Sequence, residues 1–168
     1  MARMQRLLVN LFGGWFQLPR RFSAALLDEM TAAVAASERS HRGEVCFAIE
    51  SRLAPLAVLD GLDSPTRARQ VFAQLRVWDT ECNSGVLFYV LMAEHRIEIV
   101  ADRGIAAKVA ASEWNDICAS MQERFARGQW REGSLEGIAA ANALLTRHFP
   151  GDGQATNPDE LPDRPVLL

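Results

Sequence analysis

Three short apolar segments predict the β-strands of this chain. Glu44–Glu50 and Gly85–Met92 are rich in Val, Ile, Leu and Phe, whereas Arg96–Ala101 alternates apolar and polar positions. Glu44–Glu50 is apolar on both alternating sets of positions, which is typical of a strand covered on both faces. Gly85–Met92 is the most apolar and should be central. Glu94 and His95 predict a turn into the third segment, so the last two strands should pair as an antiparallel hairpin.

Helical spacing of apolar residues dominates the rest of the chain up to about residue 150. Ser23 and Ser134 are suitable N-cap residues, and Pro65 suits the first turn of a helix. The segment 53–62 is predicted to be a loop or a short helical turn. The predicted helices cover residues 2–12, 23–40, 64 to 76 or 78, 106–126 and 133–147.

The predicted element order is α-α-β-α-β-β-α-α. A helix between two strands implies a parallel pair with a right-handed crossover, and the next strand then returns antiparallel. Helices before and after the strands can cover both faces of the sheet. The sequence therefore predicts an α/β fold, a three-layer α/β/α sandwich with a small central mixed β-sheet.

At 168 residues the chain should contain one main domain, which we place at residues 20–150. Residues 1–19 are predicted to form an N-terminal amphipathic helix and linker. Residues 151–168 are rich in Pro, Gly, Asp and Asn, which predicts an extended, partly disordered C-terminal tail. The N-terminal helix is either an interfacial membrane anchor or a helix that packs on the domain or on a partner subunit. The few basic residues before Pro19 favour packing.

The composition narrows the classes of function. A net charge of −3 argues against a nucleic-acid ligand, and 49% hydrophobic residues suffice for a packed core. Cys46, Cys82 and Cys118 form no CxxC pair, which favours a reducing compartment over a disulfide framework. The N-terminal segment lacks a small-residue cleavage site, and no apolar run approaches the roughly 20 residues that span a bilayer. We expect a cytoplasmic protein, with peripheral membrane association through residues 1–18 left open.

Polar and acidic residues should gather at one edge of the predicted sheet. Parallel strands start at the same edge and an antiparallel strand ends there, so Glu44, the segment before Gly85, and Asp102 should lie together. The predicted rim comprises Glu38, Glu44, Asp79, Thr80, Glu81, Asn83 and Asp102. Hard oxygen ligands of this kind suit Ca²⁺ or Mg²⁺.

The same residues also have a purely structural interpretation. Asp79 and Asn83 are ordinary turn formers. Asp102 can cap the helix that follows it, or pair with Arg42 or Arg103. Spacing alone leaves both interpretations open.

An ordered set of short motifs runs through the chain. Its members are Ser37-Glu38, Gly43-Glu44-Val45, Trp78-Asp79-Thr80, Asn83 with Gly85-Val86-Leu87, Asp102-Arg103-Gly104-Ile105, and Trp114. Over roughly residues 22–150 this set resembles the TPM-domain family. In the tail, Asn157 and Glu160-Leu161-Pro162 resemble the Asn-Glu-Leu-Pro ending of the stand-alone bacterial branch of that family, with Pro158 and Asp159 intervening.

The resemblance implies an α/β/α sandwich with a mixed sheet, and a divalent-cation site as in some members. One plant thylakoid member is assigned acid phosphatase activity, and other members act in photosystem repair or as membrane-receptor accessory proteins. We see neither the signal peptide nor the C-terminal membrane helix of many exported members, so we do not expect those roles. The resemblance points to these cation ligands: Asp79 and Asp102 first, with Glu38, Glu44, Thr80 and Asn83 in support.

Three functions follow as hypotheses. The first is a TPM-like accessory or binding domain with a divalent-cation site at the acidic sheet edge. The second is a metal-assisted acid phosphatase, in which Arg103 or Arg42 neutralises the phosphoryl group and an Asp acts as nucleophile or general base. The third is an accessory protein tethered to a membrane or a partner by its N-terminal helix. The lack of a GxSxG or Walker motif favours the first, and whether the protein is an enzyme stays open.

Overall fold

A mixed four-stranded sheet forms the centre of the molecule. The computed structural model describes residues 3–13, 17–151 and 160–168. The strand order is β3-β2-β1-β4, with β1 parallel to β2 and β4, and β2 antiparallel to β3. The strands are β1 (Glu44–Glu50), β2 (Gly85–Leu91), β3 (Arg96–Ala101) and β4 (Val166–Leu167). The predicted parallel pair and hairpin are confirmed.

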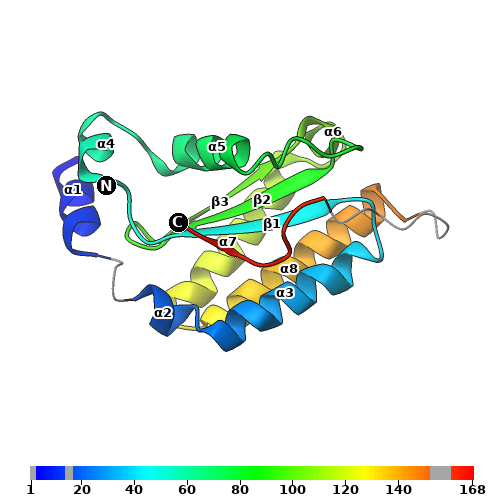
Figure 1. Cartoon of the computed structure of the whole chain (residues 1–168), viewed down its shortest axis with the longest axis horizontal. Coiled ribbons are helices and arrows are strands. Elements are labelled where there is room, and N and C mark those ends of the chain that lie inside the picture. The colour runs from blue at the N-terminus through cyan, green and yellow to red at the C-terminus, as the bar shows by residue number, and fades with distance from the viewer. Residues whose placement is uncertain (1–2, 14–16, 152–159) are drawn as a thin grey trace.

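Helices cover both faces of this sheet, as Figure 1 shows. α3, α7 and α8 pack together on one face, and α5 lies on the other. The helices are α1 (Arg3–Phe12), α2 (Leu18–Arg21), α3 (Ala24–Glu38), α4 (Pro55–Leu59), α5 (Ser64–Gln74), α6 (Arg103–Ala106), α7 (Ala111–Ala126) and α8 (Trp130–His148). The predicted α/β/α sandwich is confirmed. None of the helices among the described residues is long and apolar enough to cross a membrane.

Side chains alternate between two hydrophobic cores along the central strands. Phe47 of β1 and Phe88 of β2 stack with ring centroids 4.5 Å apart, in the core beneath α3, α7 and α8. Cys46, Leu87 and Tyr89 belong to the second core, beneath α5. Both faces of β1 and β2 are therefore buried, which explains why these two segments are apolar at consecutive positions.

The predicted helix 106–126 is divided in the structure. α6 ends at Ala106, the chain turns so that Val109 is buried in the core, and α7 begins at Ala111. The Glu113 carboxylate accepts a hydrogen bond from the Ala110 backbone N–H at 3.2 Å. This contact satisfies an N–H group at the start of the new helix, so the local sequence supports a restart at this point.

The C-terminal segment adds an edge strand that the sequence pattern did not indicate. Val166 and Leu167 pair with Ala48 and Ile49, and the Leu168 N–H donates to the Ile49 carbonyl at 2.9 Å. β4 therefore covers part of an edge of β1 that would otherwise carry unpaired backbone groups. Two residues are too few to produce a recognisable hydrophobic period.

Candidate functional site

The acidic rim is the edge of the sheet where β1 and β2 begin and β3 ends. Glu44 pairs with Gly85 across β1 and β2, and its N–H donates to the Ser84 carbonyl at 3.1 Å. On the other side of β2, the Asp102 N–H donates to the Gly85 carbonyl at 2.9 Å. Glu44 and Asp102 thus flank Gly85: Glu44 is the first residue of β1, and Asp102 directly follows the last residue of β3.

The loop 76–84 passes tightly over this edge. A Cβ atom at Gly85 would lie 1.9 Å from the Val77 carbonyl oxygen, and one at Gly104 would lie 2.5 Å from the Asn83 carbonyl oxygen. Asn83 itself adopts a left-handed backbone conformation, with φ of 50°. Only residues without a side chain at positions 85 and 104 allow this approach. Backbone oxygens of the loop therefore lie directly against the start of β2 and against α6.

Side chains of the same loop hold it in place. Thr80 is buried, and its Oγ1 accepts a hydrogen bond from the Ser84 N–H at 2.9 Å. The Ser84 hydroxyl donates to the Arg42 carbonyl at 2.8 Å. These contacts join the loop to the segment that leads into β1. Thr80 therefore has a structural role in holding the loop.

Glu38 lies at the end of α3 and is buried beneath this edge. Its Oε1 accepts a hydrogen bond from the Val45 N–H at 2.9 Å. Burial raises the pKa of Glu38 to about 9; the Val45 bond opposes the rise, and the negative charges of Glu44 and Asp163 add to it. A side-chain hydrogen bond to Asp163 also favours the protonated form. Glu38 is therefore a neutral acid at pH 7.

Asp163 is a member of this acidic group that sequence reasoning missed. It lies in the C-terminal segment just before β4, which β1 holds at the edge of the sheet. Its contact with Glu38 joins positions far apart in the chain. No local pattern in the tail marks it, because the pairing of β4 with β1 alone brings Asp163 to Glu38.

Asp102 divides its two carboxylate oxygens between different environments. Oδ1 accepts a hydrogen bond from the Arg103 N–H at 2.7 Å and so caps α6, as the structural interpretation of this residue expected. Oδ2 is buried and has no hydrogen-bond donor among the residues that the structure describes. A buried carboxylate oxygen without a described donor is costly, so Asp102 Oδ2 is an atom of the acidic rim that is suited to an added cation.

Asp79 and Glu81 occupy exposed positions in the loop. The Asp79 N–H donates to the Arg76 carbonyl at 2.8 Å, which is a turn contact. Within residues 3–13, 17–151 and 160–168, no hydrogen bond or ion pair joins the Asp79 carboxylate to another residue of the acidic rim. The Glu81 N–H donates to the Glu160 carboxylate at 3.0 Å. Asn157, Pro158 and Asp159, which precede Glu160 in the tail motif, lie outside the described residues.

Two arginines border the loop. Arg103 Nε donates to Asn83 Oδ1 at 3.2 Å, and Arg42 Nη2 contacts Cys82 Sγ at 3.2 Å. Both side chains are exposed, and neither forms an ion pair with a described carboxylate. Their positive charge therefore lies beside the acidic rim without an ion-pair partner among the described carboxylates.

The described residues contain no group of three or more His, Cys, Asp and Glu side chains arranged to hold a metal ion. The predicted rim residues fall into two groups. Glu38 and Glu44 lie together with Asp163, and Thr80, Asn83 and Asp102 lie in or beside the loop 76–84. Asp79 stays on the outside of that loop.

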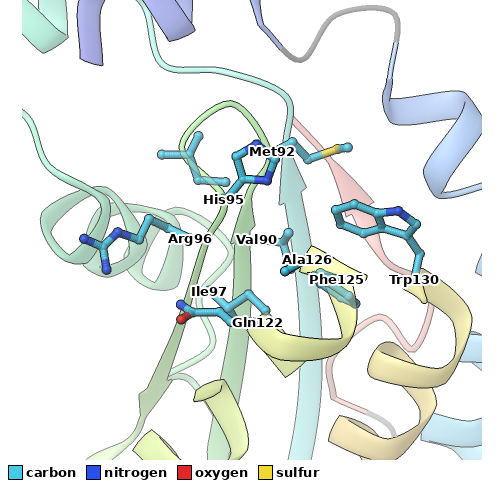
Figure 2. A pocket seen from close by; sticks show the side chains of 10 residues that line it. Val90, Met92, His95, Arg96, Ile97, Gln122, Phe125, Ala126 and Trp130 are labelled. Atoms are coloured by element: carbon cyan, nitrogen blue, oxygen red, sulfur yellow. The ribbon is translucent and has the colours of Figure 1, made fainter. Parts of the chain in front are cut away.

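The opposite end of the sheet carries a cavity that sequence reasoning missed (Figure 2). It has a volume of about 260 Å³ and lies between the β2–β3 turn, the end of α7 and the start of α8. Val90, Ile97, Phe125 and Trp130 form apolar walls, and Gln122 adds a polar group. In Figure 2 the rings of His95 and Trp130 stand on different sides of the cavity. Its walls come from distant segments, so no local motif indicates it.

A third group of polar side chains, also absent from the sequence predictions, lies beneath α5. The Tyr89 hydroxyl donates to Glu50 Oε2 at 2.6 Å. Arg67 Nε and Nη2 donate to the two Glu50 oxygens at 2.8 and 3.0 Å. Burial and the Glu50 carboxylate raise the pKa of Tyr89, so its hydroxyl remains a hydrogen-bond donor at physiological pH. This group joins α5 to β1 and β2.

The chain is similar to known proteins in sequence and in fold. Residues 20–144 match the family model of the TPM domain. The NMR structure of the BA42 protein from the psychrophilic bacterium Bizionia argentinensis sp. nov. aligns with a TM-score of 0.75 and 26% sequence identity, covering 87% of this chain and 94% of that chain. No curated protein matches the sequence. Because the family model spans well over half of the chain, this protein belongs to the TPM domain family.

Proposed function

We propose that this TPM domain is a binding domain that holds a divalent cation, Ca²⁺ or Mg²⁺, at the acidic rim. The observation that carries the proposal is the buried Oδ2 atom of Asp102, which lacks a hydrogen-bond donor among the described residues. A cation bound there would replace the missing donor. Hard cations also bind backbone carbonyl, side-chain amide and water oxygens, so the nearby loop 76–84 could supply further oxygen ligands.

Glu44 supports the proposal as a source of negative charge, and Glu38 adds to it once its proton is released. The charges acting on Glu38 are negative, and its proton compensates for them at neutral pH. A cation near the acidic rim would favour release of that proton. Cation affinity should therefore rise with pH in the range below about 9, the pKa of Glu38.

The test is thermal unfolding with and without CaCl₂ or MgCl₂. At a cation concentration about ten times Kd, the melting temperature of the wild type should rise by about 3–6 °C. Asp102→Asn should lose this rise while keeping an oxygen that can cap α6. Asp116→Asn, an exposed position on α7, is the matched control and should keep it. Asp79→Asn tests whether that exposed residue contributes.

An unchanged melting temperature of the wild type in millimolar cation would count against the proposal. So would an equal rise in wild type and Asp102→Asn, because the cation would then bind elsewhere. If only Asp79→Asn abolished the rise in melting temperature, the cation would bind at the exposed Asp79 on the outside of the loop.

A metal-assisted acid phosphatase is the second candidate, and Arg42 and Arg103 are the observation that favours it. Both guanidinium groups border the loop without a described carboxylate partner, so both can neutralise a phosphoryl group. The cation would polarise a phosphoryl oxygen, and an Asp would act as nucleophile or as general base towards water. The test is turnover of a phosphate ester with added cation by wild type, Asp79→Asn and Asp102→Asn. Equal rates in all three would indicate a contaminating phosphatase.

A further inference from the structure

The cavity beside the β2–β3 turn is larger than the fold requires. Its volume of about 260 Å³ far exceeds the water-sized voids that close packing usually leaves inside a domain. His95 and Ala126, which belong to its lining, are exposed, so the cavity opens to solvent. A small molecule can therefore enter it without displacing a buried side chain.

The aromatic wall of the cavity is fixed by its neighbours. Trp130 packs against Phe125 with ring centroids 4.5 Å apart, and the Arg21 guanidinium lies 4.5 Å from the Trp130 ring centroid. The Phe22 ring meets both rings edge-on, with centroid distances of 5.7 and 6.0 Å. A Cβ atom at Gly133 would lie 2.7 Å from the Phe125 ring, so the α8 backbone also passes directly against it. Rings held in this way lose little further freedom when a ligand binds, which favours affinity.

Gln122 supplies a hydrogen-bonding group in the lining of the same cavity. Its side chain is half-buried, and no hydrogen bond joins its amide to another described residue. A primary amide both donates and accepts hydrogen bonds. Figure 2 shows Gln122 and Trp130 on different sides of Phe125. A ligand whose ring lies against Trp130 can therefore turn a polar group towards Gln122.

The lining favours a neutral ligand. Among the described residues that line the cavity, none is acidic. Arg96 belongs to the lining, but Figure 2 shows its guanidinium group directed away from Phe125 and Trp130. An ion placed against these apolar walls would lose its hydration without gaining a partner there, which is costly.

We infer that this cavity is a binding site for a neutral aromatic molecule that carries one hydrogen-bonding group, such as a phenol. A cavity of about 150 Å³ holds one benzene ring, so a volume of about 260 Å³ corresponds to a ligand of about ten non-hydrogen atoms. The ring of the ligand packs against Trp130 and Phe125, and its hydroxyl group forms a hydrogen bond with Gln122. The cavity lies where β2 ends, whereas the acidic rim lies where β2 begins, so this site is independent of the proposed cation site.

The first test is an NMR titration of the isotope-labelled full chain with para-ethylphenol. The indole N–H signal of Trp130 should shift until the site is saturated. The corresponding signal of Trp78, a residue 49% exposed outside the cavity, is the internal control and should stay in place. No saturable shift of the Trp130 signal up to the solubility limit of para-ethylphenol would overturn the proposal.

Variants of α7 test the position and the chemistry of the site. Ala126→Phe places a ring at the opening and should weaken binding of para-ethylphenol by at least about tenfold. Ala111→Phe, at an exposed alanine at the other end of α7, is the matched control and should bind like wild type. Gln122→Met should weaken binding of para-ethylphenol about fivefold, the loss typical of one hydrogen bond. It should not weaken binding of para-ethyltoluene, in which a methyl group replaces the hydroxyl.

Circular dichroism melts verify that every variant is folded. Equal affinities of wild type, Ala126→Phe and Gln122→Met for para-ethylphenol would overturn the proposal, because the probe would then bind outside the cavity. Equal losses of para-ethylphenol and para-ethyltoluene affinity in Gln122→Met would contradict the hydrogen bond. If para-ethylbenzoate bound more tightly than para-ethylphenol, the assignment of a neutral ligand would be wrong.

Discussion

A buried carboxyl group lies near each end of β1, and the two groups are compensated in different ways. At the C-terminal end, Glu50 accepts hydrogen bonds from Arg67 and Tyr89. At the N-terminal end, Glu38 accepts the Val45 N–H and is surrounded by the negative charges of Glu44 and Asp163. One carboxylate is compensated by a guanidinium group, whereas the other is compensated by its own proton.

This difference separates a structural ion pair from a carboxyl group that can release its proton. Arg67 is covalently part of α5, so the pair that it forms with Glu50 fixes a helix to the sheet. A proton on Glu38 is not part of the chain, so it can leave when pH or a nearby positive charge changes. For this reason the acidic rim is the better candidate for cation binding, although both ends carry buried acids.

Removal of the Arg67 guanidinium group should have the largest effect on the stability of the fold. Arg67→Met leaves Glu50 buried with only Tyr89 as a partner, and we expect a loss of about 3 kcal/mol in the free energy of unfolding. Urea denaturation measures the loss. Arg131→Met is the matched control, because Arg131 pairs with Glu29 on the surface. Because that pair is exposed to solvent, the variant should unfold at nearly the same urea concentration as wild type. Equal losses would mean that the Glu50 pair is not structural.

Removal of the phenol hydroxyl should have a smaller effect. Tyr89→Phe keeps the ring in the core and the Arg67 ion pair, but it removes one donor to an ionised carboxylate. We expect a loss of about 1.5 kcal/mol, typical of a hydrogen bond to a charged group. The melting temperature should fall accordingly. If the variant were as stable as wild type, Arg67 alone would satisfy Glu50.

Glu38→Gln should have the smallest effect on stability, and the size of that effect should depend on pH. The pKa of Glu38 in the folded protein, about 9, lies above its ordinary value of 4.5. The protonated group therefore stabilises the fold fully below pH 4.5, and this contribution is lost as pH rises towards 9. Glutamine imitates the protonated form. The variant should thus be more stable than wild type by about 1 kcal/mol near pH 8, after allowance for solvent screening, and nearly equal to it in acid.

Urea denaturation at a series of pH values measures this difference. Asp163→Asn is the companion variant, since it removes one of the negative charges that act on Glu38. Its stability should fall less steeply with pH than that of wild type. Parallel stability curves for wild type and Glu38→Gln would show that Glu38 is ionised in the folded protein, and the contrast between the two ends of β1 would then disappear.

Local patterns were sufficient for most of the architecture. The apolar runs at Glu44–Glu50 and Gly85–Leu91 are strands because both of their faces are buried. The helical crossover predicted between them implied a parallel pair, and that topology brought Glu44 and Asp102 to the edge on either side of Gly85. The family resemblance was also visible in short motifs, and the family match over residues 20–144 confirms it.

Such local patterns did not predict contacts between segments that are distant in the sequence. The cavity beside Trp130 and the pairing of Glu50 with Arg67 each need two or more elements to be packed. Hydrophobic spacing in α1 correctly indicated an amphipathic helix, but spacing does not tell which side meets the domain. That choice depends on Glu94, a residue of the β2–β3 turn that offers a buried carboxylate to Arg6 and Asn10.

The sequence by itself determined the three longer strands, most of the helices, the mixed arrangement of those strands and the family, because burial on one or two faces imposes a period on the chain. The tertiary structure alone decided which charges meet. It placed Asp163 against Glu38 through β4, left Asp102 Oδ2 without a described donor, and turned the apolar side of α1 outward. Charge compensation depends on distances of a few ångströms between segments remote in sequence, and no local period records those distances.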